Sequence, residues 1–233
     1  MFFGHQSVGR NIMEGVREIL AERSNIRLRI VQGPYAASSS DAVFIDANIG
    51  ENRRPETKAQ AFAKAVENGL GPGALAMYKY CYVDVGDQTD IQALFEAYVA
   101  QTRRLERAHP DTTIIHITVP LTTAPEGIKE NVKIFLGRRT ETALNAKRHL
   151  FNELLRKEYG GRAPIFDLAH LESMRPDGSP ASSKFRSKEV PMLAPEWTFD
   201  NGHLNESGRR YIAEQFLVTL ARAAALKPVA EAS

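Results

Sequence analysis

The chain opens with Phe2-Phe3-Gly4-His5-Gln6-Ser7-Val8-Gly9, and this stretch decides how the rest of the sequence is interpreted. Phe2 and Phe3 are typical of the end of a buried strand. Apolar residues then recur at helical spacing, at Val8, Ile12, Val16, Ile19 and Leu20. The stretch therefore predicts a first strand that turns directly into a helix, with Ser7 at the turn.

The remaining sequence alternates between strand and helix signals. Strands are expected at 26–30, 74–85, 112–119 and 163–168, and helices at 59–66, 91–105, 144–159 and 205–226. Loops are expected at 36–40 and 173–195, where small and turn-forming residues are frequent. Because this alternation favours right-handed crossovers, we predict an α/β fold with about five parallel strands and helices on both faces. In this prediction residues 1–226 form one domain and 227–233 a tail.

The composition is that of an ordinary globular protein, with 43% hydrophobic and 25% charged residues. The formal net charge is only +2 and basic residues are interleaved with acidic ones, so no nucleic-acid partner is expected. No stretch is long and apolar enough to span a bilayer, and no signal peptide opens the chain. The first residues already resemble the end of a strand, so the sequence is compatible with a longer precursor. Both a cytoplasmic and a secreted location therefore remain open. Nothing in the sequence indicates the oligomeric state.

Cysteine and histidine usage argues against disulfides and metal centres. Cys81 is the single cysteine and lies in an apolar run, so we expect a buried thiol rather than a nucleophile. The six histidines show no HExxH spacing, and no metal site is expected. Glycine-rich nucleotide-binding patterns are missing as well, so no cofactor is expected. His116, in the middle of a predicted strand, is expected to be a hydrogen-bonded core histidine.

The position of Ser7 favours chemistry at its hydroxyl. A serine at a strand-to-helix turn projects over the edge of the sheet where ligands of parallel α/β folds bind. The free N–H groups and the positive dipole end of the helix point at the same spot and can hold an oxyanion. The alternative is that Ser7 only caps the helix, a common role for serine.

A second segment, Asp200-Asn201-Gly202-His203-Leu204, comes directly before the last predicted helix. A serine hydroxyl needs a base such as histidine, and the base needs a carboxylate that fixes its tautomer. Asp200 and His203 are three positions apart on a turn, so the carboxylate can reach the near ring nitrogen while the far one stays free for Ser7. The alternative is ordinary loop chemistry around Gly202.

Taken together, the two segments resemble the SGNH/GDSL hydrolase superfamily. In that family the nucleophilic serine follows the first strand, and an Asp-x-x-His pair precedes the last helix. The resemblance implies a flavodoxin-like three-layer α/β/α sandwich and a triad of Ser7, His203 and Asp200. The stretch from Ala146 to Leu168, a helix followed by Pro-Ile-Phe-Asp-Leu, is similar to the segment that precedes the pair in the family.

The match has departures from the family pattern. Gln6 stands where the family has aspartate before the serine. Gly50 is the candidate for the oxyanion glycine. At the place of the family's Gly-x-Asn-Asp block, Val83 cannot donate a hydrogen bond through its side chain, and Asn52 is the candidate substitute. His5 could line the site or point aside.

These residues predict a serine esterase that acts on a small acyl ester, such as an acetyl ester of a carbohydrate, through an acyl-enzyme. Two alternatives stay open: an acyltransferase that uses the same triad, and an inactive binding module of the same fold, which the valine at 83 favours. An α/β-hydrolase fits poorly because its nucleophile elbow lies in mid-chain within a Gly-x-Ser-x-Gly pattern.

Three loops, at 34–54, 122–139 and 173–195, are expected to shape the pocket. Arg138, Arg139 and Arg148 lie after the fourth predicted strand and could bind an anionic group. A solvated helix face is the default expectation for them.

Overall fold

A computed structural model describes residues 1–33, 43–123 and 140–226 of the chain. Its centre is a parallel sheet of six strands in the order β2-β3-β1-β4-β5-β6. The strands are β1 (Phe2–His5), β2 (Arg29–Gln32), β3 (Val43–Asn48), β4 (Leu75–Tyr78), β5 (Thr113–Ile117) and β6 (Ile165–Phe166). Because β1 lies between β3 and β4, the chain leaves it at the place where the strand order reverses, which is where α/β folds bind ligands.

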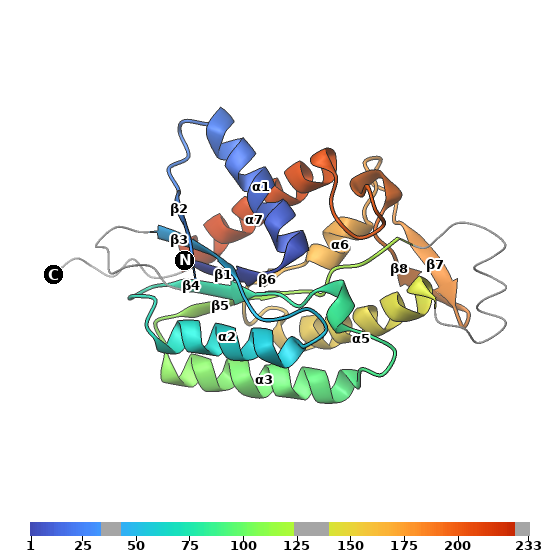
Figure 1. Ribbon diagram of the computed structural model, residues 1–233, viewed down its shortest axis with the longest axis horizontal. Helices are drawn as coiled ribbons and strands as arrows, with labels where there is room; N and C mark the ends of the chain where they lie inside the picture. The colour runs from blue at the N-terminus through green and yellow to red at the C-terminus, as the bar shows by residue number, and fades with distance from the viewer. Residues whose placement is uncertain (34–42, 124–139, 227–233) are drawn as a thin grey trace.

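Helices cover both faces of the sheet, so the fold is the predicted α/β/α sandwich (Figure 1). One face carries α1 (Ser7–Glu22), α6 (Leu168–Ser173) and α7 (Glu206–Ala225), and the other carries α2 (Pro55–Glu67), α3 (Ile91–Ala108) and α5 (Glu141–Tyr159). The alternating side chains of the strands divide the apolar interior accordingly: Phe3 and Met77 pack in the α1/α7 core, Phe2 and Tyr78 in the opposite one.

The first and last helices lie side by side and bring the two ends of the described chain together (Figure 1). They approach closely because Gly15 has no side chain: a Cβ there would come within 2.5 Å of the carbonyl oxygen of Arg209. Arg210 also pairs with Glu22, with a guanidinium-to-carboxylate distance of 2.6 Å. This packing fixes where the segment before α7 lies relative to the start of α1.

Two parts of the structure differ from the sequence prediction. The strand β3 was not expected, because Asp46 and Asn48 weaken its strand pattern; Asp46 is nevertheless buried, paired with His5 and Arg17. The segment 173–195 is not all loop, since β7 (Ser182–Phe185) and β8 (Lys188–Pro191) form an antiparallel hairpin. Its turn residues, Arg186 and Ser187, have positive φ angles of 48° and 66° without the usual Asn-Gly signal.

The predicted strand over 74–85 is also shorter than expected. It ends with β4 at Tyr78, and a single 3-10 turn, η1 (Tyr82–Asp84), follows; a second, η2 (Pro195–Trp197), precedes α7. Two core predictions are confirmed: Cys81 is a buried free thiol, and His116 is fully buried with Nδ1 2.8 Å from the hydroxyl of Tyr98. Across the described ranges, no helix carries an apolar stretch that could cross a membrane. The predicted tail, 227–233, lies outside them.

Candidate active site

The segments singled out in the sequence meet at the carboxyl ends of the central strands. Ser7 follows β1, Gly50 follows β3, and η1 follows β4. The 200–203 turn reaches the same place because the N–H of Leu204 donates to Oδ1 of Asn11, 193 positions away, at 3.3 Å. Since Asn11 lies one turn beyond Ser7 in α1, this hydrogen bond places the neighbour of His203 beside the first turns of that helix.

Ser7 is the first residue of α1 rather than its cap. Gln6 occupies the N-cap position, and no side chain caps the helix there. The Ser7 side chain is half-buried, and its hydroxyl makes no hydrogen bond to the residues the structure describes. The capping role considered from the sequence is therefore not the one that Ser7 has.

Asp200 and His203 form a hydrogen-bonded pair. Nδ1 of His203 lies 2.6 Å from Oδ2 of Asp200, and the other carboxylate oxygen accepts the backbone N–H groups of His203 and Gly202 at 2.7 and 3.1 Å. Partial burial opposes ionisation of Asp200, but these N–H groups and the imidazole outweigh it and lower the pKa of the carboxyl. The carboxylate thus keeps the proton of a neutral His203 on Nδ1. Nε2 is left as an acceptor without a partner among the described residues.

The turn that carries this pair is held from two sides. Thr123 donates its hydroxyl to Oδ1 of Asn201 at 2.8 Å and its backbone N–H to the Asn201 carbonyl at 3.0 Å. On the other side Gly202 lies against Tyr82, where an added Cβ would come within 2.9 Å of the ring hydroxyl. The Tyr82 ring also meets the imidazole of His203 edge-on, with 5.9 Å between centroids.

A pocket of about 340 Å³ opens between this turn and η1. Its lining includes Tyr82, Val83 and Leu144 as apolar groups, and Arg148, Asp200 and Gly202. Val83 is one of these lining residues, and its side chain offers no hydrogen-bond donor to the pocket.

Arg148 corrects one sequence expectation, because it does not lie on a solvated helix face. Its side chain is only 2% exposed, and burial lowers the pKa of the guanidinium. Nε donates to the carbonyl oxygen of Tyr82 at 3.0 Å, and Nη1 donates to the hydroxyl of Thr122 at 2.8 Å. Arg148 therefore ties α5 to η1 and to the chain after β5. Arg138 and Arg139 lie outside the described residues.

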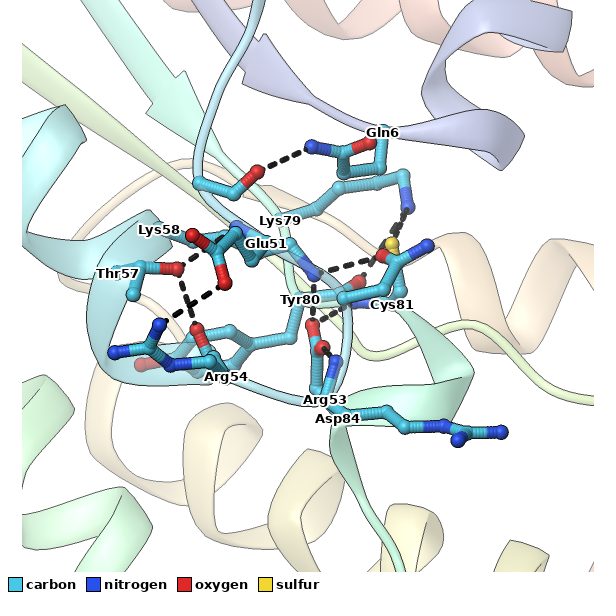
Figure 2. A network of polar contacts seen from close by, with 12 residues as sticks. Gln6, Glu51, Arg53, Arg54, Thr57, Lys58, Lys79, Tyr80, Cys81 and Asp84 are labelled. Atoms are coloured by element: carbon cyan, nitrogen blue, oxygen red, sulfur yellow. Dashed lines mark hydrogen bonds and ion pairs between the residues drawn. The ribbon is translucent and has the colours of Figure 1, made fainter.

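The loop between β3 and α2 carries Gly50, the residue that the sequence analysis selected as the oxyanion candidate. Gly50 has a φ of +60° and packs so closely on α2 that a Cβ would lie 2.5 Å from the backbone nitrogen of Lys58. The carboxamide of Gln6 donates to the carbonyl oxygens of Ile49 at 2.9 Å and Gly50 at 2.6 Å. Gln6 therefore fastens this loop to the turn that carries Ser7, as Figure 2 shows for one of the two bonds.

His5 lies behind the site and does not line it. It is 4% exposed, with Nε2 2.6 Å from Oδ1 of Asp46 and Nδ1 2.9 Å from the carbonyl oxygen of Gln6. Gly9 packs directly on its ring, so α1 covers it. Burial would raise the pKa of Asp46, but the hydrogen bonds from His5 and Arg17 prevail and lower it. Strand alternation thus turns His5 beneath α1.

The sequence analysis did not predict that Lys58 and Asp84 are buried together as an ion pair. Both side chains are fully buried, and Nζ of Lys58 lies 2.5 Å from Oδ2 of Asp84 (Figure 2). A lysine in an amphipathic helix gives no signal of burial, because its normal place is the solvated face. Among the described residues no group of three or more His, Cys, Asp or Glu side chains is placed to hold a metal ion.

Comparisons with known proteins identify the fold through solved structures. No family model and no curated protein matches the chain. A GDSL-like lipase from Bacteroides thetaiotaomicron superposes with a TM-score of 0.56 at 14% identity, covering 97% of this chain and 87% of that one. An acetyl esterase, solved as a mutant with an acetate ion, gives 0.51 at 13% identity, covering 97% of each. The chain has the SGNH hydrolase fold.

A carbohydrate esterase family 3 protein from Talaromyces cellulolyticus also shares the SGNH fold, with a TM-score of 0.50 at 12% identity over 98% of each chain. The resemblance drawn from two short motifs is thus confirmed for the fold. The SGNH architecture explains why Ser7, Gly50 and His203 reach one edge of the sheet although they come from distant parts of the sequence.

Proposed function

We propose that this protein is a serine esterase in which Ser7 is the nucleophile, His203 the general base and Asp200 its orienting carboxylate. The observation that carries the proposal is the Asp200–His203 hydrogen bond, which leaves Nε2 unpartnered among the described residues, on a turn fastened to α1 just beyond Ser7. The hydrogen bond from Gln6 to Gly50 holds a second loop beside the turn that carries Ser7, which supports the assignment of the oxyanion donors to this loop.

The reaction proceeds through an acyl-enzyme. Nε2 of His203 takes the Ser7 proton as Oγ bonds to the ester carbonyl carbon, and the carbonyl π pair moves onto its oxygen. The backbone N–H groups of Ser7 and Gly50 stabilise this oxyanion. Collapse breaks the bond to the alcohol oxygen, which receives the proton from His203. Water then attacks the acyl group by the same route and releases the carboxylic acid and free Ser7.

The substrate class is a small acyl ester, such as an acetyl ester of a carbohydrate. The pocket of about 340 Å³ is lined by Asp200 and Gly202 but not by Ser7 or His203, so it lies beside the proposed triad. Its volume is at the small end of the range for ligand sites, which suits a short acyl group or one sugar ring better than a long lipid chain. Two of the structural neighbours are named as an acetyl esterase and a carbohydrate esterase.

The deciding experiment compares Ser7→Ala with the wild type on p-nitrophenyl acetate and with a fluorophosphonate probe. We expect Ser7→Ala to lower kcat by at least about 10⁴-fold and to abolish labelling, because no other group can form the acyl-enzyme. Ser182→Ala, in the exposed β7–β8 hairpin, is the matched control and should behave as the wild type. Retained turnover in the Ser7 variant would reject the proposal.

The same assay separates the alternatives that share this fold. A wild-type protein that neither turns over esters nor reacts with the probe would be an inactive binding module. A rate that rises strongly when an acetylated donor is offered a carbohydrate acceptor, with the acyl group found on the acceptor, would indicate an acyltransferase. Hydrolysis that is indifferent to the acceptor supports the esterase.

A further inference from the structure

The SGNH pattern has an asparagine as a side-chain oxyanion donor where this chain has Val83. Asn52 is the candidate for a replacement donor. Asn52 lies two positions after Gly50, in the loop that Gln6 fastens to Ser7. It is exposed, so its amide can meet a substrate. Val83, on the neighbouring η1, has no donor to offer.

The orientation of the Asn52 amide follows from its contact with Lys58. Nζ of Lys58 lies 3.1 Å from the Asn52 side chain. A lysine ammonium only donates hydrogen bonds, so the atom facing it must be the amide oxygen. The NH₂ group is therefore on the side away from the ammonium. Among the described residues it has no acceptor, and both of its hydrogens are available.

Lys58 is itself held rigidly. Its ammonium is fully buried against Asp84, which also accepts the backbone N–H of Arg53 at 2.8 Å and that of Cys81 at 2.7 Å. Figure 2 shows Lys58, Arg53 and Cys81 converging on this one carboxylate. The loop of residues 50–54 is thereby fixed to η1, and Arg53 is held there with a φ of 67°.

Two sets of contacts thus hold the same loop. Gln6 fixes Gly50 to the turn that carries Ser7. The Lys58–Asp84 pair fixes Asn52 and Arg53 to η1. A buried ion pair adds little net stability, since the loss of hydration offsets much of the Coulomb attraction. What it supplies here is a fixed direction for the amide of Asn52.

We infer that Lys58 is a positioning residue: through the buried pair with Asp84 it orients Asn52, whose NH₂ group supplies the side-chain oxyanion donor that Val83 cannot. This inference rests on the proposed function, because an oxyanion donor has meaning only if Ser7 attacks a carbonyl. It concerns how the transition state is stabilised and leaves the triad unchanged.

A double-mutant cycle tests it, with Asn52→Ala on one axis and the neutral pair Lys58→Met/Asp84→Asn on the other. The pair is changed together because a lone buried carboxylate would destabilise the fold. The single amide oxygen of an asparagine at 84 can still accept the N–H of Arg53, whereas the bond from the N–H of Cys81 to the other oxygen is lost. We expect Asn52→Ala to lower kcat on p-nitrophenyl acetate by about 10²–10³-fold with KM changed less than about threefold. The pair should lower kcat by about tenfold or more in the wild-type background and by less than about twofold in the Asn52→Ala background.

Asn68→Ala and Lys64→Met, exposed residues at the end of the same helix, are the matched controls and should leave kcat unchanged. If the neutral pair does not fold, Asn52→Asp decides alone: it keeps the oxygen that Lys58 holds, removes the N–H donors and adds a negative charge, so kcat should fall at least as far as in Asn52→Ala. Unchanged kcat in both Asn52 variants, or losses from Asn52 and the pair that simply multiply, would overturn the inference. The proposed function fails separately, through a Ser7→Ala variant that still turns over.

Discussion

The base side and the oxyanion side of the proposed site are built in different ways. On the base side, Asp200 and His203 are three positions apart, and their side chains are 40% and 27% exposed. On the oxyanion side, Lys58 and Asp84 are 26 positions apart and fully buried, and Gln6 reaches across 44 positions to Gly50. The base side is thus a local turn near solvent, whereas the oxyanion side is held by long-range contacts that include the buried Lys58–Asp84 pair.

This difference matches what each side would have to do in the proposed reaction. A base must accept and return a proton in every turnover, so it needs a ring that is oriented but accessible. An oxyanion site stabilises charge only to the extent that its dipoles are already fixed when the charge appears, so rigidity and burial serve it. Substitutions on the two sides should therefore leave different signatures in activity and stability.

The largest effect is expected from Asp200→Asn on the base side. Asparagine can still accept the backbone N–H groups of Gly202 and His203, so the turn should survive and the melting temperature should change little. It no longer holds the proton of His203 on Nδ1 as a carboxylate does, and kcat should fall by about 10²–10⁴-fold. Steady-state kinetics with a thermal melt checks this. A variant within about tenfold of the wild type would mean that the imidazole needs no carboxylate.

An intermediate effect is expected from Gln6→Met on the oxyanion side, and here stability should fall together with activity. The substitution leaves the carbonyls of Ile49 and Gly50 without their donor, which should cost about 1–3 kcal/mol in the free energy of unfolding. Loosening the Gly50 loop should also lower kcat by about 10–100-fold, since displacements near 1 Å have that effect. Kinetics and denaturant unfolding measure the two quantities.

The matched control for Gln6→Met is Gln101→Met. The Gln101 carboxamide donates to the carbonyl oxygen of Ala59 at 2.6 Å, a comparable clamp between α3 and α2 away from the serine. We expect a similar loss of stability with unchanged kcat. Equal losses of activity in both variants would show that Gln6 acts through general stability, and the contrast between the two sides would lose its support.

The same contrast explains how much could be predicted from the sequence. The strand–turn–helix around Ser7 and the Asp200–His203 pair depend on contacts within a few residues, so their spacing was visible. The Lys58–Asp84 pair depends on the packing of α2 against the end of β4, and lysine and aspartate look like surface residues until that packing is known. The strand β3 was missed for a related reason: Asp46 resembles a strand breaker but is neutralised by His5 and Arg17, partners from β1 and α1. Arg148 was assigned to solvent because its buried acceptors, Tyr82 and Thr122, lie far away in sequence.

The smallest effect on kcat is expected from His116, a buried group that has no ionised partner in hydrogen-bonding contact. His116 is stacked on Tyr159, with ring centroids 3.5 Å apart, and burial lowers its pKa from 6.5 to about 3. Between pH 6.5 and 3 the unfolded chain therefore binds a proton at this position and the folded chain does not, so the free energy of unfolding falls as the pH falls through that window.

His116→Gln should remove this term, because glutamine does not titrate and can still accept a hydrogen bond from the hydroxyl of Tyr98. The free energy of unfolding of the wild type, relative to that of the variant, should fall by roughly 2–3 kcal/mol between pH 7 and pH 4, measured by denaturant unfolding at each pH. The ratio of their kcat values should stay constant over the range where both are folded, because His116 lies in the core on the α3/α5 side of the sheet. A ratio that changes with pH would couple this core to the serine. In that case a buried group far from Ser7 would affect kcat, and an effect of the Lys58–Asp84 pair on kcat could no longer be attributed to its contact with Asn52.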